Sequence, residues 1–355
     1  MEPIPGVIEF TPVFFERIWG GSRLAQRIGL NPPADKTIGE AWLLSDHAEC
    51  ESVVTSGPFE GETLGALLKR APAAILGSHA PQTIHGRFPL LLKLIDSDQP
   101  LSVQVHPSDD DARRLGEPDV GKTEMWHILS ADPGSELICG LEEGVTRDAL
   151  ARAIAEGSVE GLVRRFQVQS GDSVFVPAGR VHAIGAGIVL AEIQQNSNIT
   201  YRLYDWGRLQ ADGTARTLHV DKSLEVAAFA SSKGGKLTPL GYDRAGARCA
   251  LLAACRYFAA EEVCVSGHLT RETGGTSFHI MLLKSGRIQV AAMGAGAPLR
   301  PGHAILMAGQ ASVLEMTGEG ELLEYYVPVM EQDIVVPLRA AGHSDRAIEA
   351  LGQRF

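Results

Sequence analysis

The sequence predicts a mainly β protein built from two sandwich or barrel units, with helices confined to inserts and to the C-terminal tail. The 39 glycines and 19 prolines among 355 residues indicate many turns, as expected of short strands. Apolar runs of strand length also recur at regular intervals in both halves of the chain. A chain of this length is too long for one ordinary core, which favours two domains.

Composition and charge narrow the possible classes of function. The net charge of −11 and the lack of a dense Lys/Arg run argue against a nucleic-acid partner. No apolar stretch is long enough to span a bilayer, and the first six residues lack the features of a signal peptide. The five cysteines are scattered without CxxC spacing, which is typical of reduced thiols. We therefore expect a cytoplasmic protein with no membrane partner, and the sequence predicts no oligomeric state.

Strands and helices alternate in the first half. Short apolar or strand-like segments are expected over Val7–Phe15, Ala41–Leu44, Phe88–Ile95, Leu101–Val105, Thr123–Leu129, Glu136–Leu141, Ser173–Val176 and Ile188–Ile193. Helices are expected over Thr63–Ala74, Ser108–Leu115, Thr146–Ile154 and Val159–Phe166. Ser108 and Thr146 are plausible N-caps, and three aspartates follow Ser108 in the first turn, where a helix dipole favours negative charge.

A change in composition near Ser231–Lys236 predicts a linker. Beyond it, short strands are expected over Tyr257–Val265, Phe278–Leu283, Arg287–Ala291, Ala304–Met307 and Leu322–Val327. The predicted domains are therefore residues 1–232, with a helical insert at about 107–166, and residues 233–355.

The stretch Leu101–Pro107 places Gln104 and His106 two residues apart in an apolar run. Side chains at positions i and i+2 of a strand lie on one face, so these two would share a surface. A single Gln or His on an apolar strand is more often a hydrogen-bonded core residue than a ligand. The pair therefore indicates a metal site only if further ligands lie nearby.

A second polar motif runs from Gly171 to His182. It combines a turn, a short strand, a tight turn at Pro177–Gly179 and a histidine. This spacing resembles the second motif of the cupin superfamily, in which Gly, Pro, Gly and His recur at these intervals, although Ala186 stands where an asparagine often ends it. The resemblance implies a cupin-type jelly-roll barrel, with His182 as a metal ligand.

The first cupin motif usually supplies two histidines and a glutamate. Here Gln104 takes the place of the first histidine, His106 matches the second, and the glutamate follows later than usual, as Glu124. That departure is what the type I phosphomannose isomerases show. The segments that resemble this family, in the same order, are Ile18–Gly21, Ile38–Trp42, Gln99–Ser108, Gly121–Trp126, Val181–Gly187 and Ala191–Trp206.

This resemblance, over roughly the first two-thirds of the chain, implies a fold and a cofactor. The chain would form two cupin-type jelly-roll barrels with small helical inserts, the first catalytic and the second degenerate and without metal. His106, Glu124 and His182 would bind one Zn²⁺ per chain, with Gln104 as the fourth ligand. Two imidazoles, a carboxylate and an amide oxygen also suit a borderline divalent ion on chemical grounds.

The resemblance further implies an aldose–ketose isomerase that moves a proton between C1 and C2 through an enediol. Arg202 matches the family's essential arginine and could hold an enediolate oxygen or the phosphate. Lys122 and Lys93 match lysines of the family's pocket, and either could bind phosphate as a point charge, although Lys93 could equally extend from a strand end to solvent. The proton-transferring group stays open between Glu192, Lys122 and a water on the metal.

Other polar and aromatic residues are expected to be structural. Glu192 is interpreted mainly as a partner of a ligand or of another buried charge, Trp19 and Trp42 as core, and Glu40 as a residue that could approach the pocket. The histidines outside the motifs lack a ligand pattern. They are His127, His219, His268, His279, His303 and His343.

The predicted function is therefore zinc-dependent interconversion of mannose 6-phosphate and fructose 6-phosphate, with a small sugar phosphate as the partner and no nucleic acid or membrane. The non-enzymatic alternative is a sugar-phosphate-binding cupin that acts as a sensor. The presence of every expected ligand together with Arg202 argues against it. The enzymatic alternative, an iron-dependent cupin oxygenase, is disfavoured by Gln104 and by the late position of Glu124.

Overall fold

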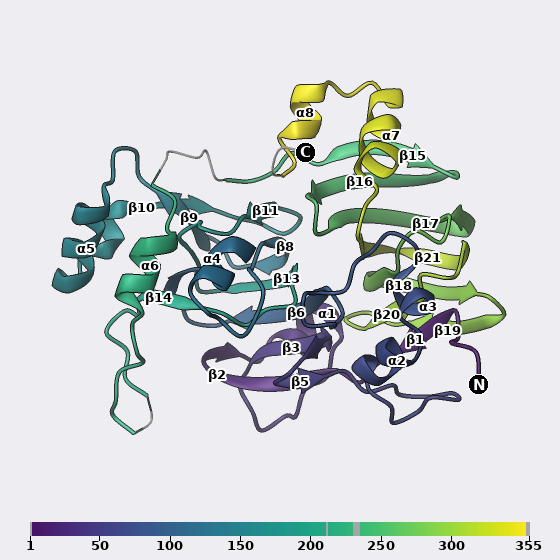
Figure 1. Cartoon of the computed structure of the whole chain (residues 1–355), viewed down its shortest axis with the longest axis horizontal. Coiled ribbons are helices and arrows are strands. Elements are labelled where there is room, and N and C mark those ends of the chain that lie inside the picture. Colours follow the sequence, from purple (N-terminus) through teal and green to yellow (C-terminus); the bar gives the residue numbers. More distant parts are fainter. Residues whose placement is uncertain (1, 211, 230–234, 353–355) are drawn as a thin grey trace.

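The computed structural model describes residues 2–210, 212–229 and 235–352. Its strands form antiparallel sheets in two groups that lie side by side along the long axis of the molecule (Figure 1). The expectation of a mainly β protein is confirmed. Among the described residues, no helix is long and apolar enough to cross a membrane.

The first group contains two sheets that face each other across the candidate site. One sheet has the order β11-β8-β13-β6-β2-β3, and the other has the order β10-β9-β12-β7-β14. Their bounds are β2 Val13–Gly21, β3 Ile38–Leu44, β6 Leu90–Ser97, β7 Val103–Val105, β8 Glu124–Ala131, β9 Glu136–Leu141, β10 Val163–Gln167, β11 Ser173–Val176, β12 His182–Ile184, β13 Ile188–Gln195 and β14 Tyr201–Tyr204. A separate pair of short strands consists of β4 Asp46–His47 and β5 Cys50–Glu51.

The second group is one sheet with the order β1-β20-β18-β21-β17-β16-β15, in which β19 also pairs with β18. Its bounds are β1 Val7–Glu9, β15 Leu240–Arg244, β16 Ala247–Ala254, β17 Ala259–Glu272, β18 His279–Ala292, β19 Ala295–Leu299, β20 Ala304–Met307 and β21 Val313–Tyr326. Strand β1 comes from the N-terminus and pairs with β20, so Val7 lies opposite Met307. The N-terminal segment thus completes the C-terminal sheet.

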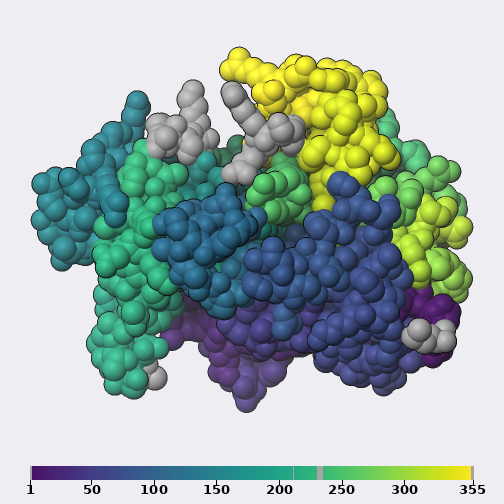
Figure 2. All heavy atoms as spheres, in the orientation of Figure 1, coloured from purple at the N-terminus to yellow at the C-terminus, as the bar shows by residue number. Residues whose placement is uncertain are grey.

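Helices lie at the edges and between the two groups. They are α1 Leu24–Ile28, α2 Leu64–Arg70, α3 Pro72–Leu76, α4 Asp109–Arg114, α5 Arg147–Glu156, the 3-10 turn η1 Val159–Leu162, α6 Val220–Val226, the π-helical turn η2 Met330–Val335, α7 Val336–Ala340 and α8 Asp345–Glu349. In the space-filling view, the segments that carry α2, α3 and α4 cover the middle of the face turned to the viewer (Figure 2).

Several expected elements are confirmed by their caps. Ser108 accepts a hydrogen bond from the Asp111 backbone N–H, and Asp111 bonds back, so α4 begins with a capping box. The Thr146 hydroxyl accepts from Ala149 N–H at the start of α5. The predicted helix Thr63–Ala74 is instead two helices, because Pro72 lacks an N–H and begins α3 at the point where α2 has ended.

Two expectations were wrong in detail. The predicted helix Val159–Phe166 ends at Leu162, and the chain continues as strand β10. The two strands expected over Phe278–Leu283 and Arg287–Ala291 are one strand, β18, whose pairing register shifts between Leu283 and Ser285. The strands expected over Thr123–Leu129 and Glu136–Leu141, within the insert at about 107–166, are present as β8 and β9. The linker residues 231–234 and the boundary at 232/233 lie outside the described residues, and the division into two domains stays a prediction.

The two groups of strands share a hydrophobic core. Phe88 from the first group packs against Phe278 from the second with ring centroids 4.3 Å apart and ring planes tilted by 46°, and Phe175 packs against Phe258 at 6.3 Å. All four side chains are buried in one apolar cluster that extends through both groups. Such aromatic contacts add stability beyond the burial of apolar area, so the two groups stabilise each other.

Buried charges occupy the interior of the C-terminal sheet. Arg271 on β17 is ion-paired with Glu324 on β21, and His279 Nδ1 lies 2.6 Å from the other oxygen of that carboxylate. Burial raises the pKa of Glu324, but Arg271 outweighs it and the pKa falls to about 2. The sequence showed no pattern around His279, because its partners come from distant strands.

We predict that Arg271→Met lowers the free energy of unfolding by about 3–5 kcal/mol, because Glu324 would stay buried without its cation. The measurement is urea denaturation of the variant beside the parent protein. Arg287→Met, at an exposed position of β18, is the control and should change the free energy by less than about 0.5 kcal/mol. Equal midpoints for all three proteins would contradict the importance of this ion pair.

A second prediction concerns His127, a buried residue of β8 whose Nδ1 lies 3.0 Å from Ser173 Oγ. Burial, aided by the positive charge of Lys284, lowers the pKa of His127 to about 4. The unfolded chain therefore binds more protons than the folded one between pH 6.5 and 4. We expect stability to fall by roughly 3 kcal/mol as the pH drops through this window. Urea midpoints across it should vary less in His127→Gln, and an unchanged pH profile would exclude His127 as the cause.

Candidate metal centre and active-site cavity

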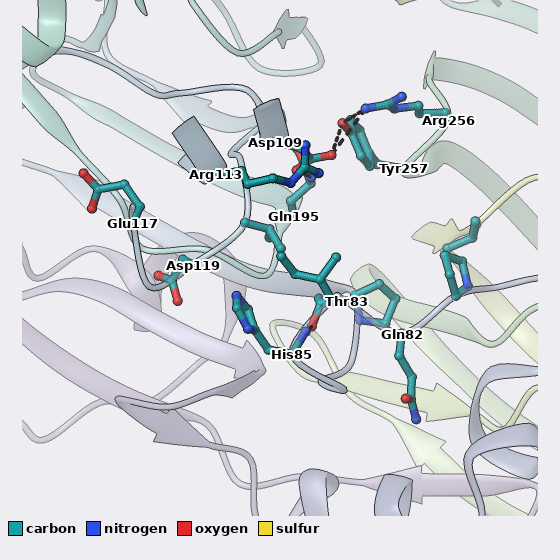
Figure 3. A pocket seen from close by; sticks show the side chains of 15 residues that line it. Gln82, Thr83, His85, Asp109, Arg113, Glu117, Asp119, Gln195, Arg256 and Tyr257 are labelled. Atoms are coloured by element: carbon teal, nitrogen blue, oxygen red, sulfur yellow. Dashed lines mark hydrogen bonds and ion pairs between the residues drawn. The ribbon is translucent and has the colours of Figure 1, made fainter. Parts of the chain in front are cut away.

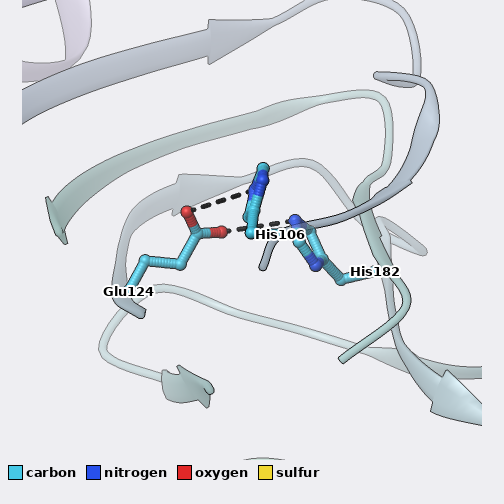
Figure 4. Close-up of side chains that lie close together, drawn as sticks. All are labelled: His106, Glu124 and His182. Carbon is cyan, nitrogen blue, oxygen red and sulfur yellow. Dashed lines mark ion pairs between the residues drawn. The ribbon is translucent and has the colours of Figure 1, made fainter. Parts of the chain in front are cut away.

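Three buried side chains meet between the two sheets of the first group: His106, Glu124 and His182 (Figure 4). His106 follows β7, Glu124 begins β8, and His182 begins β12. One candidate ligand atom from each lies within 4.8 Å of the others. The Glu124 oxygens are 3.6 Å from His106 Nε2 and 3.4 Å from His182 Nε2. Three predicted ligands that are far apart in the sequence are thus brought together.

The hydrogen bonds of the two imidazoles fix their orientation. His106 Nδ1 is 2.7 Å from the Ile199 carbonyl oxygen, and His182 Nδ1 is 2.8 Å from that of Arg180. Because a carbonyl only accepts, each Nδ1 carries the proton and each Nε2 presents a lone pair toward Glu124. Burial lowers the pKa of both histidines, that of His182 to about 3, so both are neutral at pH 7. Neutral imidazole is the form that binds a metal.

The centre fits a divalent cation. Glu124 Oε1 and His182 Nε2 are buried and have no hydrogen-bond partner among the described residues. Buried polar atoms of native proteins nearly always have a partner, because leaving one unsatisfied costs about 1–3 kcal/mol. A cation bound by both atoms would satisfy them, and two imidazoles with one carboxylate form a common ligand set for zinc.

Gln104 lies directly opposite His182 in the pairing of β7 with β12, and opposite Arg202 in the pairing of β7 with β14. Residues opposite each other on neighbouring strands point to the same face of a sheet. Arg202, Gln104 and His182 therefore form a row across this sheet. Gln104 also lines the cavity in front of the centre, and its role as a ligand stays a prediction.

Lys122 adds a positive charge beside the three candidate ligands. Its buried ammonium group donates to Glu124 Oε2 and lies 3.1 Å from His106 Nε2. Burial alone would lower the pKa of Lys122, but the carboxylates of Glu124 and Glu192 outweigh it and raise the pKa. Lys122 is therefore charged at pH 7, at one end of the cavity.

The cavity in front of the centre has a volume of about 420 Å³, which is suitable for a small polar ligand. Its charged and polar lining includes predicted residues and residues that the sequence did not indicate. The predicted ones are Lys93, Gln104, Lys122 and Arg202, with Glu40 and Glu192; those not predicted include Arg17, Ser102, Asn198, Gln210 and Arg216.

A compact group of charges surrounds Lys93 at the metal end of the cavity. The Lys93 ammonium is buried, lies 3.7 Å from Glu192 and 3.8 Å from Glu40, and sits 4.7 Å from the centre of the Trp42 ring. Burial, with the Glu124 charge, raises the pKa of Glu192, whereas Lys93 and Arg17 outweigh burial at Glu40 and lower its pKa to about 2. Two carboxylates in one cavity thus have pKa values displaced in opposite directions.

The other end of the cavity is strongly positive. Arg202 donates to Ser102 Oγ at 3.3 Å and to the Thr217 carbonyl at 2.8 Å. Arg208 and Arg216 both bind the same carboxylate, that of Asp205, at 2.6 Å and 2.5 Å. Burial lowers the pKa of Arg202, and the positive charges of Arg216 and Arg208 add to this effect. Arg208 and Arg216 therefore share one carboxylate, and Arg202 is a third guanidinium group close enough to feel their charges.

Arg17 and Arg216 escaped sequence-based reasoning because nothing local marks them. Arg17 is held by its Nε bond of 2.8 Å to Glu40, a partner from a different strand. Arg216 lies in the loop between β14 and α6 and reaches the cavity only through the fold. The sequence held only an indirect indication of Arg216. Its partner Asp205 lies at the end of the segment 191–206, which resembles the family.

The fold and the site are those of a cupin-type protein with a candidate metal centre. The family model "Phosphomannose isomerase type I, catalytic domain" matches residues 7–124. Mannose-6-phosphate isomerase of Streptococcus mutans is 36% identical over 277 residues, which cover 78% of this chain and 84% of that protein. The chain therefore belongs to the type I phosphomannose isomerase family.

Further comparisons agree with this assignment. Mannose-6-phosphate isomerase ManA of Bacillus subtilis is 44% identical over 218 residues, which cover 61% of this chain and 66% of that protein, just under two thirds. The crystal structure of a Bacillus subtilis mannose 6-phosphate isomerase superposes with a TM-score of 0.81 at 32% identity, covering 90% and 99% of the two chains. A zinc-bound mannose 6-phosphate isomerase shares the fold at 16% identity, with a TM-score of 0.73 and coverage of 91% and 100%.

We predict that His106→Ala and His182→Ala each abolish tight binding of a divalent ion, because loss of one donor from a three-residue set typically costs far more than tenfold in affinity. Gln104→Ala should retain the ion with weaker affinity. Metal content after dialysis, measured by atomic emission, tests this. His127→Gln, a change at a buried histidine outside the centre, should keep the parent's content. Full metal content in His106→Ala and His182→Ala would disprove the assignment.

Proposed function

We propose that this chain interconverts mannose 6-phosphate and fructose 6-phosphate as a zinc-dependent aldose–ketose isomerase. One Zn²⁺ per chain would be held by His106, Glu124 and His182, with Gln104 as the fourth ligand. The observation that carries the proposal is the arrangement of one cavity, with two neutral histidines and Glu124 at one end and a surplus of arginines at the other. Family membership and the zinc-bound relative support the same function.

Arg202 and Arg216 would bind the phosphate. Three guanidinium groups against one carboxylate leave two positive charges near the cavity wall, which a phosphate dianion would neutralise. A guanidinium is well suited to this task because its donors match phosphate oxygens in pairs. With the row Arg202–Gln104–His182 in this order, the phosphate would lie two strands from the centre, and C1 and C2 of the sugar would lie near Glu124.

A divalent ion at the centre would supply Lewis-acid polarisation of the substrate's carbonyl oxygen. The Lys122 ammonium, charged and buried beside Glu124, would donate to the oxygen on which negative charge develops in the enediolate. Such donors are most effective where water is excluded, and Lys122 is 5% exposed. Lys122 would therefore act on the reacting end of the sugar, and not on its phosphate.

Glu192 is the group that we propose to move the proton between C1 and C2. Glu192 lines the cavity, and its pKa is raised toward the neutral pH at which the enzyme would work. A general base is most effective when its pKa lies near the working pH. Trp126 Nε1 donates to its Oε2 at 3.0 Å, so the carboxylate is held in one orientation. Lys93, between Glu192 and Glu40, would keep Glu192 ionised when the substrate is absent.

The five cysteines of the chain are unpaired within the described structure, which supports a reducing, cytoplasmic location. This location is part of the proposal.

A coupled assay with mannose 6-phosphate tests the function. We expect turnover in the purified protein, loss of at least about 100-fold after chelation, and recovery with Zn²⁺, since the centre would otherwise lose its electrophile. A protein that binds one Zn²⁺ and mannose 6-phosphate but gives no turnover would overturn the proposal and favour the sugar-phosphate sensor.

Variants at the two ends of the cavity should behave differently. Arg216→Gln is expected to raise KM about 10–100-fold with a smaller change in kcat, because it removes a charged contact to the phosphate. Glu192→Gln should lower kcat about 100-fold or more with little change in KM. Steady-state kinetics of both variants, with exposed Arg147→Gln as the control, give the answer. A large loss of kcat in Arg216→Gln together with a raised KM in Glu192→Gln would show that the substrate binds with its phosphate near Glu192.

A further inference from the structure

A second cavity, of about 380 Å³, lies where the two groups of strands meet (Figure 3). It is enclosed by the loop of residues 81–89, by α4 with the segment that follows it, and by the turn between β16 and β17. No residue lines both this cavity and the one in front of the metal centre. Its volume falls within the range of about 300–1,000 Å³ typical of small-molecule sites.

The walls of this second cavity are mainly apolar, with Pro81, Pro89, Val120, Tyr257 and Val327 among them. Figure 3 shows Tyr257 facing the space from one side, with Arg256 beyond it. A flat apolar ligand can bury its faces against such prolines and an aromatic ring. The apolar lining therefore indicates a ligand whose larger part is flat and apolar.

The charged side chains around the cavity indicate which chemical group the other end of the ligand would carry. The carboxylates already have partners: Asp119 Oδ2 accepts from Asn198 N–H at 3.0 Å and contacts His47, and Glu117 accepts from Tyr201 OH at 2.7 Å. Arg113 and Arg256, in contrast, have side chains that are 64% and 72% exposed. Each guanidinium group makes its side-chain hydrogen bonds through one nitrogen, and that of Arg256 also lies over the Tyr257 ring at 4.6 Å. The other nitrogens keep donors for a ligand.

We propose that the second cavity binds an amphipathic organic anion, with its flat apolar body against Tyr257 and its anionic group at Arg113 and Arg256. A carboxylate, a sulfonate or a phosphate would satisfy the same donors. This site is separate from the substrate cavity and would be occupied at the same time.

Hydrogen bonds connect this site to the metal centre. Asp109, on the cavity wall, accepts from Tyr257 OH at 2.6 Å, from Gly121 N–H at 2.9 Å and from Gln195 Nε2 at 2.9 Å. Gln195 Oε1 in turn accepts from Thr123 N–H at 2.9 Å. Asp109 and Gln195 thus hold the backbone of the segment that carries Lys122 and Glu124.

An anion that draws Arg256 and Tyr257 toward itself would weaken their contacts with Asp109, and the change would reach residues 121–124. Occupancy of the second cavity should therefore alter the affinity of the centre for Zn²⁺. This coupling rests on the proposed function of His106, Glu124 and His182 as ligands, whereas binding of the anion does not.

The probe for binding is 8-anilino-1-naphthalenesulfonate, which has a flat apolar body and one sulfonate. We expect saturable fluorescence enhancement that excess mannose 6-phosphate does not displace. Arg113→Glu combined with Arg256→Glu should weaken binding at least about tenfold, because two attractive charges become repulsive. Arg147→Glu, an equal change of charge far from the cavity, should leave the affinity unchanged.

Ile84→Asp, at a lining position that is 71% exposed, provides a second variant with little risk to folding, and it too should weaken binding. Equal affinity in the parent, the double variant and Ile84→Asp would overturn the proposal. Displacement by mannose 6-phosphate at a single site would also overturn it, because the probe would then lie in the substrate cavity.

Coupling is measured as the Zn²⁺ dissociation constant with and without saturating probe. We expect a change of about fivefold or more, which disappears in the Arg113→Glu/Arg256→Glu variant. Probe binding with an unchanged Zn²⁺ dissociation constant would disprove the coupling between the two sites, but the proposed anion site would stand. Because neither readout needs turnover, failure of the isomerase proposal would be recognised separately in the mannose 6-phosphate assay.

Discussion

The structure depends on one constraint: two imidazoles and a carboxylate are buried together at the centre. Two of their acceptor atoms, Glu124 Oε1 and His182 Nε2, have no hydrogen-bond donor among the described residues. Ile199 and Arg180 carbonyl oxygens take the Nδ1 protons and so aim both Nε2 lone pairs at Glu124. Burial keeps both rings neutral. An arrangement of this kind is costly without a cation and stable with one, which is why we propose that the strand ends around it bind a metal ion.

In the proposed function, the distribution of charge along the cavity would orient the substrate. Near the centre, Lys93 and Arg17 are matched by Glu40 and Glu192, and Lys122 by Glu124. At the far end, arginines exceed carboxylates. A sugar phosphate carries its two negative charges at one end only, and it would therefore fit this gradient in one orientation.

Local features of the sequence predicted the structure well. The motifs around His106 and His182 correctly indicated two residues that meet at the centre, whereas a shared face of Gln104 and His106 stays a prediction. Predictions failed where distant segments meet. Arg17, Arg216 and the partners of His279 are positioned by other strands, and the second cavity is assembled from several separate segments. One long strand, β18, was also predicted as two short ones, and its pairing register shifts between Leu283 and Ser285.

The central claim is that the reacting carbons lie at the His106–Glu124–His182 centre and the phosphate at Arg202 and Arg216. A crystal structure with Zn²⁺ and mannose 6-phosphate, with data collected at the zinc absorption edge, tests it most directly. The account predicts one anomalous peak between the three side chains, C1 and C2 beside Glu192, and the phosphate on the two arginines. A phosphate bound at Lys93 or Lys122, or a zinc peak elsewhere, would contradict it.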